Sequence, residues 1–537
     1  MTTILDIQDL SVSLPPGGDR EFAIEEVSLT VDSCEIVCVV GESGSGKSVT
    51  AFSVMGLLDR RALNPVAGTI RLADKDLLTI DDRTLRQLRG ERVSMIFQEP
   101  MTALNPVMRV GDQIAETLEI HTGLSSTQRH ARVLQALADV QLPDPKSLAI
   151  SYPHQLSGGQ RQRIMIAMAL ILEPKLLIAD EPTTALDVTT QAKILALIKQ
   201  LQSSRGMGVL FITHDFGVVA EIADRVIVMQ NGRIVEQGQV DHLLNAPKHP
   251  YTRLLIDAVP SMTPPERRHS NDKEALAANR IHKIYGKSGW FGRGRVVHAA
   301  QDISLTLRRG ETLGIVGESG SGKSTVARCI MRLIDPTSGE ILIDSIDIAA
   351  LRQSELRRFR HQIQIIFQDP YRSLNPRRTV GDSIVEGPMN FGVAAVEAWE
   401  RARELMETVG LSAESLSRFP HQFSGGQRQR ICIARALAMK PRILIADEAV
   451  SALDVSVQAQ VLDLLDDVRQ EFQLAMLFIT HDLRVAAQIC DRIMVMQDGQ
   501  LVERGSTATV YANPQQQYTR ELLAAAPGRR KFPQKVG

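Results

Sequence analysis

A glycine-rich motif that can bind phosphate occurs twice in the chain. The sequence GESGSGKS spans residues 41–48 and again residues 317–324. Backbone N–H groups of such a loop surround phosphate oxygens, its lysine reaches the β- and γ-phosphates, and its serine can ligate Mg²⁺. The expected phosphate contacts are Gly41, Glu42, Ser43, Gly44, Ser45, Gly46, Lys47 and Ser48, and in the second copy Gly317, Glu318, Ser319, Gly320, Ser321, Gly322, Lys323, Ser324 and Thr325.

Paired carboxylates follow an apolar run in each copy. Asp180 and Asp447 end the runs LLIAD and ILIAD. A buried carboxylate needs a partner or a metal ion, and Mg²⁺ beside a phosphate loop is the natural one. Glu181 and Glu448 come next in the chain, where a carboxylate can polarise an attacking water. We therefore expect hydrolysis of a phosphoanhydride at two sites.

Two further polar residues recur at matching places. Gln98 and Gln368 lie in the repeated sequences IFQEP and IFQDP. We expect them to complete the coordination shell of the metal ion and to contact the attacking water. His214 and His481 follow apolar runs at the same distance from the aspartates. A lone histidine at a strand end is more often structural, but the repetition favours a contact with the γ-phosphate.

These motifs recur in the same order because the chain is a tandem duplication. LSGGQRQR at residues 156–163 returns as FSGGQRQR at residues 423–430, and FITHD also occurs twice. The repeat unit is a whole domain. The predicted organisation is a first domain at residues 1–260, a polar linker at 261–274, a second domain at 275–527 and a basic tail at 528–537.

Short apolar runs alternate with helical patterns in both copies, which favours an α/β fold with a mostly parallel core sheet. Each domain is expected to be a P-loop NTPase domain with a separate helical lobe. The predicted strands are 35–40, 176–179, 209–213 and 311–316, and the predicted helices are 49–58, 126–140, 188–201 and 325–334.

Composition excludes several other classes. Lys and Arg number 61 against 62 for Asp and Glu, and aromatic residues are only 4%, so a basic or base-stacking surface for nucleic acid is not expected. No apolar run reaches the roughly 20 residues that cross a bilayer, and no signal-peptide pattern begins the chain. The cysteines lack metal-site spacing and are expected to be buried small hydrophobic residues: Cys34, Cys38, Cys329, Cys432 and Cys490.

The ordered motif set resembles the ATP-binding cassette (ABC) ATPases over essentially the whole chain. LSGGQ and FSGGQ match the family signature, which in that family caps ATP bound to the opposite cassette. The resemblance implies composite head-to-tail sites, formed within one chain. The signature residues are Ser157, Gly158, Gly159 and Gln160, and Ser424, Gly425, Gly426 and Gln427, with D-loop residues Asp187 and Asp454 at the same interface.

The two copies differ at two places. The second reads EAV at residues 448–450 where the first reads EPT at 181–183, which predicts a changed turn without loss of a catalytic group. The family stacks adenine on an aromatic residue before the P-loop. Tyr285 fits that place in the second copy, whereas the first has Leu14, with Phe22 as a displaced candidate.

Two other repeats resemble the oligopeptide, dipeptide and nickel importer branch. These are FQEPMTALNP with FQDPYRSLNP, and the domain ends HPYTRLLIDAVP with QQYTRELLAAAP. The tandem layout is similar to fused ATP-binding subunits of peptide, glutathione and microcin C uptake systems. The resemblance implies ATP and Mg²⁺ as cofactors and import of peptides or a peptide-like solute.

It also implies two transmembrane permease subunits, an external solute-binding protein and a peripheral place on the cytoplasmic side of the plasma membrane. Three alternatives stay open: a soluble tandem ABC ATPase acting on ribosomes or DNA, a fused sugar-importer ATPase, and an importer of nickel, glutathione or opines. Against the first, the linker is short and the chain has no cysteine-rich insert; against the second, both copies keep every chemical residue.

Overall fold

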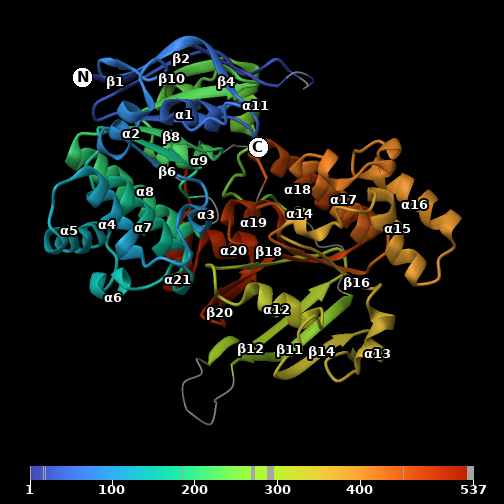
Figure 1. The fold of residues 1–537 in the computed structure, drawn as a ribbon. Helices are drawn as coiled ribbons and strands as arrows, with labels where there is room; N and C mark the ends of the chain where they lie inside the picture. Colours follow the sequence, from blue (N-terminus) through green and yellow to red (C-terminus); the bar gives the residue numbers. More distant parts are fainter. Residues whose placement is uncertain are drawn as a thin grey trace. The chain divides into compact units, whose positions relative to one another are not determined.

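The computed structural model describes residues 2–15, 17, 20–183, 186–267, 273–286, 296–451 and 453–528. Two compact units divide the chain. The first consists mainly of Met1–Leu186 and Thr190–Val259, and the second mainly of Pro260–Ala526. Each repeats the same sequence of elements, drawn from blue to green and from yellow to red in Figure 1.

The first unit contains a six-stranded sheet in the order β10-β9-β3-β8-β7-β6. All neighbouring strands are parallel except β10, which pairs antiparallel with β9. A second, antiparallel sheet has the order β2-β1-β4-β5. The strands are β1 (Thr3–Ser13), β2 (Phe22–Asp32), β3 (Ile36–Val40), β4 (Asn64–Leu72), β5 (Lys75–Asp76), β6 (Val93–Ile96), β7 (Leu176–Asp180), β8 (Gly208–Ile212), β9 (Arg225–Gln230) and β10 (Arg233–Gln239).

The central strands are apolar at every position because both faces of the parallel sheet are covered. All five residues of β3 are buried, and they alternate between two cores. Ile36 and Val40 pack with the helical lobe, whereas Val37 and Val39 pack toward the antiparallel sheet and α1. The helices are α1 (Lys47–Met55), α2 (Asp82–Glu91), α3 (Pro100–Ala103), α4 (Val110–His121), α5 (Ser126–Asp139), α6 (Pro145–Ala149), α7 (Gly158–Leu170), α8 (Val188–Arg205), α9 (Phe216–Ile222), α10 (Val240–Asn245) and α11 (Pro250–Asp257).

The second unit repeats this architecture, with sheet orders β16-β17-β18-β13-β19-β20 and β12-β11-β14-β15. Its strands are β11 (Glu274–Tyr285), β12 (Val297–Arg308), β13 (Thr312–Val316), β14 (Ser338–Ile343), β15 (Ile346–Asp347), β16 (Ile363–Ile366), β17 (Ile443–Asp447), β18 (Ala475–Thr480), β19 (Arg492–Gln497) and β20 (Gln500–Ser506). Its helices are α12 (Lys323–Ile330), α13 (Gln353–Leu356), α14 (Pro370–Ser373), α15 (Val380–Asn390), α16 (Ala395–Thr408), α17 (Gly425–Leu437), α18 (Val455–Phe472), α19 (Leu483–Ile489), α20 (Thr507–Ala512) and α21 (Gln517–Ala525).

The predicted fold class is confirmed, and the differences from the expected elements are local. Helix α1 ends at Met55, three residues earlier than predicted, because Gly56 adopts the left-handed conformation with φ 61°. Cys34 is not buried as expected: it is exposed in the turn between β2 and β3, with φ 59°. The predicted basic tail lies outside the described residues from residue 529 onward.

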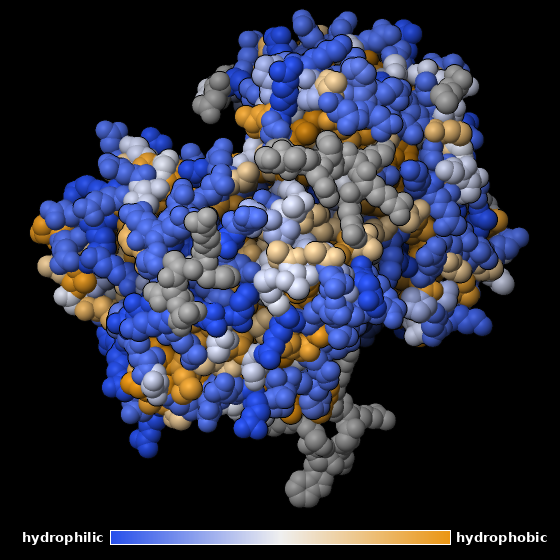
Figure 2. Space-filling model, turned by 180° about the vertical axis from the view of Figure 1, so that it is seen from behind, coloured by the Kyte–Doolittle hydropathy of each residue, from blue (hydrophilic) through white to orange (hydrophobic). Residues whose placement is uncertain are grey.

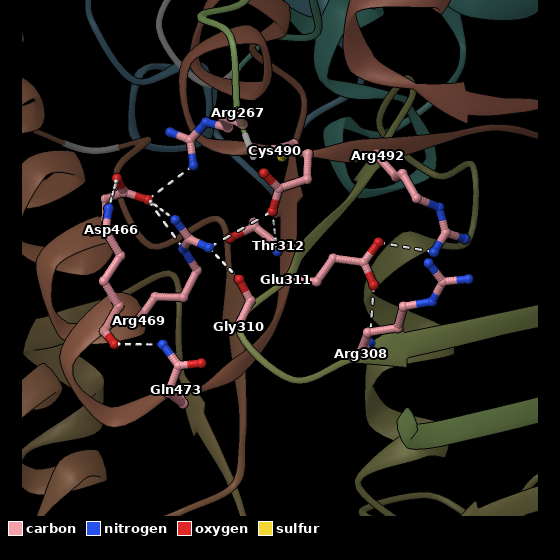
Figure 3. A network of polar contacts seen from close by, with 12 residues as sticks. Arg267, Arg308, Gly310, Glu311, Thr312, Asp466, Arg469, Gln473, Cys490 and Arg492 are labelled. Carbon is pink, nitrogen blue, oxygen red and sulfur yellow. Dashed lines mark hydrogen bonds and ion pairs between the residues drawn. The ribbon is translucent and has the colours of Figure 1, made fainter. Parts of the chain in front are cut away.

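Residues 261–267, expected to form part of a linker, pack on the second unit. The Arg267 guanidinium donates to Asp466 Oδ1 at 2.9 Å and to the carbonyl of Gln488. Arg469 also binds Asp466 Oδ1, at 2.8 Å, so one carboxylate joins two arginines (Figure 3). Met262 packs against the apolar core of this unit. The segment is therefore an ordered part of the second unit.

The surface shown in Figure 2 is largely hydrophilic, with apolar residues in small separate areas. Isolated exposed apolar side chains include Val107 and Val396, which are 79% and 72% exposed. Among the residues that the structure describes, no helix is both long enough and apolar enough to span a bilayer.

Candidate functional site

Four neighbouring strands of the first unit bring the predicted site residues to one edge of the sheet. The P-loop follows β3, Gln98 follows β6, Asp180 ends β7 and His214 follows β8. These strands are parallel and adjacent in the order β3-β8-β7-β6. Their carboxyl ends therefore meet, which is where open α/β sheets bind ligands.

The P-loop is closely packed and holds its lysine internally. Lys47 Nζ donates to the carbonyl oxygens of Gly41 and Glu42 at 2.7 and 2.8 Å. Gly41 has φ 151°, and a Cβ there would lie 2.2 Å from the Met229 carbonyl oxygen. Gly317 repeats the constraint, with a Cβ 2.2 Å from the Met496 carbonyl oxygen. Only glycine fits at these positions, so the loop conformation is fixed by packing.

Ser48 and Asp180 form an oxygen pair beside the P-loop. Ser48 Oγ donates to Asp180 Oδ1 at 3.2 Å. Burial raises the pKa of Asp180 to about 6, although the hydrogen bond from Ser48 opposes that shift. A carboxylate in such surroundings is stabilised by a cation. The hydroxyl and carboxylate oxygens are ligands that suit Mg²⁺, which keeps several waters and phosphate oxygens in its shell.

The predicted catalytic glutamate is held between two other predicted site residues. Gln98 Nε2 donates to Glu181 Oε2 at 2.9 Å, and His214 Nδ1 lies 3.1 Å from Glu181 Oε1. Glu181 has φ 46°, and its N–H donates to the Ile212 carbonyl at 2.9 Å. This left-handed residue directly follows Asp180, the last residue of β7.

The second unit reproduces the site. Lys323 Nζ donates to the Gly317 and Glu318 carbonyls at 2.8 and 2.7 Å. The remaining pairs are Ser324 Oγ to Asp447 Oδ1 at 2.9 Å, Gln368 Nε2 to Glu448 Oε2 at 2.7 Å, and His481 Nδ1 to Glu448 Oε1 at 3.4 Å.

Electrostatics in the second site favour an ion pair between glutamate and histidine. Burial alone would raise the pKa of Glu448, but the bond from His481 lowers it overall. Burial likewise opposes the charged form of His481, yet Glu448 raises the pKa of that imidazole. Burial lowers the pKa of Lys323, against the pull of the nearby carboxylates. A carboxylate that stays ionised is suited to accept a proton from water.

The predicted change of turn after the second glutamate does not occur. Glu448 has φ 51° and donates its N–H to the Ile479 carbonyl at 2.9 Å, as Glu181 does to Ile212. Ala449, which replaces Pro182, is buried at the same place. The backbone pairing, rather than the proline, fixes this turn.

The signature sequences begin helices α7 and α17. Ser157 and Gln160 form a capping box, and so do Ser424 and Gln427. A Cβ at Gly159 would lie 2.7 Å from Thr190 Cγ2 within the same unit. Gly158 and Gly425 form the first turns, and Gly426 has the tight position equivalent to Gly159, with a Cβ 2.3 Å from Val457 Cγ1. Both helix starts can offer N–H groups to an anion.

The remaining predicted contacts lie at element ends. Asp187 and Asp454 directly precede α8 and α18, while their neighbours at positions 185 and 452 lie outside the described residues. Tyr285 ends β11 with 39% of its surface exposed. Leu14, at the matching place, packs against the core of the first unit, and Phe22 pairs with the last residue of β1.

Two tyrosines at the P-loops were missed by sequence reasoning. The Tyr251 hydroxyl accepts the Glu42 N–H at 3.1 Å, and the Tyr518 hydroxyl accepts the Glu318 N–H at 3.2 Å. The repeated YTR sequence was the available signal, but it marked only the end of each domain.

Among the described residues, no cluster of three or more His, Cys, Asp or Glu side chains could hold a metal ion.

Sequence families match both units. The ABC transporter family matches residues 24–184 and 300–451. The family described as oligopeptide/dipeptide transporter, C-terminal region, matches residues 235–287. The two cassettes therefore lie in one chain, with the site residues of each inside or near its matched region.

Curated relatives extend over nearly the whole chain. The glutathione import ATP-binding protein GsiA of Salmonella paratyphi A is 47% identical, over 98% of this chain and 89% of that protein. GsiA of Escherichia coli K12 is 46% identical, over 99% and 91%. The archaeal ribosome recycling factor aABCE1, in complex with the ribosomal stalk protein aP1, shares the fold with a TM-score of 0.60 at 20% identity, over 92% of this chain and 90% of that one. The chain belongs to the ABC transporter family, as an energy-coupling ATPase subunit of the importer type.

Proposed function

We propose that this chain hydrolyses two ATP molecules to drive uptake of glutathione or another short peptide-like solute through separate membrane subunits. The observation that carries the proposal is the 46–47% identity to glutathione import ATP-binding proteins over nearly the full chain. The match of residues 235–287 to the oligopeptide/dipeptide transporter C-terminal region supports the solute class.

ATP phosphates are proposed to bind the two P-loops. Lys47 and Lys323 each contact two carbonyl oxygens of their own P-loop, so each ammonium group is held beside the loop that would surround the phosphates. The N-termini of α1 and α12 add the positive end of a helix dipole. Adenine is proposed to stack on Tyr285 in the second site, where 39% of that residue's surface is exposed. The first site has Leu14 at the matching place, with Phe22 as a displaced candidate.

Mg²⁺ is proposed to be held by Ser48, Asp180 and Gln98, and by Ser324, Asp447 and Gln368. When bound, it would neutralise negative charge on the phosphate oxygens. Burial raises the pKa of Asp447, as it does for Asp180, so an adjacent cation would relieve an unfavourable carboxylate charge. The proposed metal sites rest on the hydroxyl and carboxylate oxygens of the pairs Ser48–Asp180 and Ser324–Asp447, which suit Mg²⁺.

Glu181 and Glu448 are proposed to accept a proton from the attacking water. Each carboxylate is oriented by a glutamine on one oxygen and a histidine on the other. His481 is favoured in its protonated form by Glu448, and an imidazolium can donate to the γ-phosphate. His214 is proposed to act in the same way at the first site.

Each signature helix is proposed to complete the site of the other cassette. Ser424, Gly426 and Gln427 would then cap the ATP held by Lys47, and Ser157, Gly159 and Gln160 the ATP held by Lys323. Hydrolysis would remove the ligand that joins the cassettes and shift the population toward an open pair. Linkage in one chain makes this pairing independent of protein concentration.

The partners are proposed to be two permease subunits and an external solute-binding protein, with this chain on the cytoplasmic side of the membrane. The segments after Gln98 and Gln368 are the proposed permease contacts. They begin with the short helices α3 and α14, which come directly after these glutamines in the chain.

The test is reconstitution of the full chain with its candidate permeases and binding protein in lipid vesicles. We expect ATP-dependent accumulation of radiolabelled glutathione or short peptides, and loss of accumulation in the Glu181→Gln, Glu448→Gln double variant. Uptake of nickel alone would overturn the proposed solute class. Co-purification with ribosomes or DNA, without permeases, would overturn the transport role.

A further inference from the structure

A tyrosine hydroxyl from the C-terminal segment of each cassette contacts the second residue of its P-loop. Tyr251, in α11, accepts the N–H of Glu42 at 3.1 Å and donates to Glu42 Oε2 at 3.2 Å. Tyr518, in α21, accepts the N–H of Glu318 at 3.2 Å. Burial raises the pKa of Tyr518 to about 12, so its hydroxyl stays protonated at neutral pH.

The P-loop residue that the tyrosine binds also holds the loop lysine. The Glu42 carbonyl accepts Lys47 Nζ at 2.8 Å, and the Glu318 carbonyl accepts Lys323 Nζ at 2.7 Å. The N–H of each glutamate is therefore fixed by tyrosine while its carbonyl faces the lysine. The Glu42 N–H shares its peptide group with the Gly41 carbonyl, which also accepts Lys47 Nζ, at 2.7 Å, and the Gly317 carbonyl accepts Lys323 Nζ in the same way at 2.8 Å. A rotation of that peptide group would break the lysine contact and the tyrosine bond together.

The helix that carries each tyrosine is anchored to the edge of the main sheet. Glu236, on β10, accepts the N–H groups of Lys248 and His249 at 2.8 and 3.0 Å, just before α11. Glu503, on β20, accepts those of Gln515 and Gln516 at 2.8 and 3.1 Å, just before α21. Tyr251 is itself only 8% exposed. Each tyrosine hydroxyl is thus carried by a helix whose start is hydrogen-bonded to the edge strand of the main sheet.

We propose that Tyr251 and Tyr518 are positioning residues that hold the P-loop ready for triphosphate, so that the C-terminal segment of each cassette sets its affinity for ATP. This inference rests on the proposed binding of phosphate by Lys47 and Lys323. It gives the segment that follows the last strand of each main sheet a role in nucleotide binding. The tyrosines act through the loop peptide and touch no reacting atom.

The test is replacement of each hydroxyl in the full chain: Tyr251→Phe, Tyr518→Phe and both together. Fluorescent ATP-analogue titration and steady-state hydrolysis are measured on the same preparations. A hydrogen bond of ordinary strength predicts about 2- to 10-fold weaker nucleotide binding per site. We expect KM for ATP to rise by a similar factor while kcat changes less than about twofold, because the catalytic glutamates are untouched.

Tyr511→Phe is the matched control. The Tyr511 hydroxyl is also buried in the C-terminal segment, but it donates to the Leu483 carbonyl and not to the P-loop. This variant should lower the melting temperature and leave ATP affinity unchanged. If Tyr251→Phe and Tyr518→Phe also lower only the melting temperature, the tyrosines are structural and the proposal is overturned.

Lys47→Ala and Lys323→Ala separate this inference from the proposed function. Loss of nucleotide binding in the lysine variants, with wild-type affinity in the tyrosine variants, would reject the positioning role alone. Unchanged binding in the lysine variants would reject the phosphate assignment itself. Weaker binding in both sets supports both.

Discussion

Gln98 donates a hydrogen bond to one carboxylate oxygen of Glu181, at 2.9 Å, while the other oxygen of Glu181 faces the ring of His214. Gln368 binds Glu448 in the same way at 2.7 Å. The two glutamates are therefore each oriented by contacts with neighbouring side chains. Preorganisation of this kind lowers the cost of arranging the reacting groups.

Replacement of both glutamates by glutamine should stop turnover without loss of ATP binding. Glutamine keeps the shape of the side chain and one acceptor oxygen, but its amide cannot accept a proton from water. We expect hydrolysis to fall by about 10²- to 10⁴-fold, the usual contribution of a general base. Glu173→Gln, a surface carboxylate paired with Arg132, is the control and should hydrolyse ATP normally. Near wild-type hydrolysis in the double variant would refute the assigned role.

Replacement of the buried Asp447 should have opposite effects on the stability of the second unit and on ATP hydrolysis. Burial raises the pKa of Asp447, so Asp447→Asn removes an unfavourable charge and should raise the melting temperature by about 2–4 °C without nucleotide or Mg²⁺. Hydrolysis should fall at least about tenfold because a proposed metal ligand is lost. Scanning calorimetry and phosphate release measure the two effects. Asp344→Asn, an exposed carboxylate, is the control, and a lower melting temperature in Asp447→Asn would contradict the argument.

The two cassettes should bind adenine through different residues. Tyr285→Leu gives the second cassette the residue found at position 14 of the first, and should weaken ATP at the second site by about tenfold. Phe22→Leu should have a comparable effect at the first site. Titration with ATP and with inorganic triphosphate distinguishes base from phosphate contacts, because only ATP binding should change. Equal loss for both ligands would argue against stacking.

The contact between Arg267 and Asp466 should stabilise the second unit at neutral pH. Burial alone would raise the pKa of Asp466, but Arg267 and Arg469 lower it overall. A lowered pKa contributes stability above the unfolded value, about 4, which is lost as the pH falls through the folded value. Arg267→Ala should therefore lower the free energy of unfolding by about 1–2 kcal/mol at pH 7 and by less near pH 3.

Urea unfolding of a double-mutant cycle with Asp466→Ala measures this pair directly. Asp466 also binds Arg469, so the single Asp466→Ala change should cost more than Arg267→Ala. Additive effects of the two substitutions, at every pH, would show that the pair does not interact.

The sequence was sufficient to predict the parallel core and the residues at its carboxyl edge, because those residues belong to contiguous motifs. Asp180 and Glu181, for example, follow a fully apolar strand, and their place at its end needs no tertiary information. Helix ends were less accurate where one residue adopts a left-handed conformation. Gly56 shortens α1 in this way, and the exposed turn at Cys34 has the same origin.

The tyrosine contacts could not be predicted because they join segments far apart in the chain. Tyr251 and Glu42 are 209 residues apart, and neither residue type is unusual at its position. The order of residues 261–267 was missed for a similar reason. Their polar composition is typical of a linker. Arg267 is held by Asp466 and by the Gln488 carbonyl, and both of these partners come much later in the sequence.

The anchored segment determines where the gene could be divided to yield separate halves. A second half that started at Glu274 would remove Arg267 from Asp466, which would keep Arg469 and Gln470 as partners, and would remove Met262 from the side of the apolar core. A second half that started at Pro260 would keep both contacts. Residues 261–267 therefore belong to the second domain although their composition is typical of a spacer. Either half should be expressed alone with its boundary at residue 260.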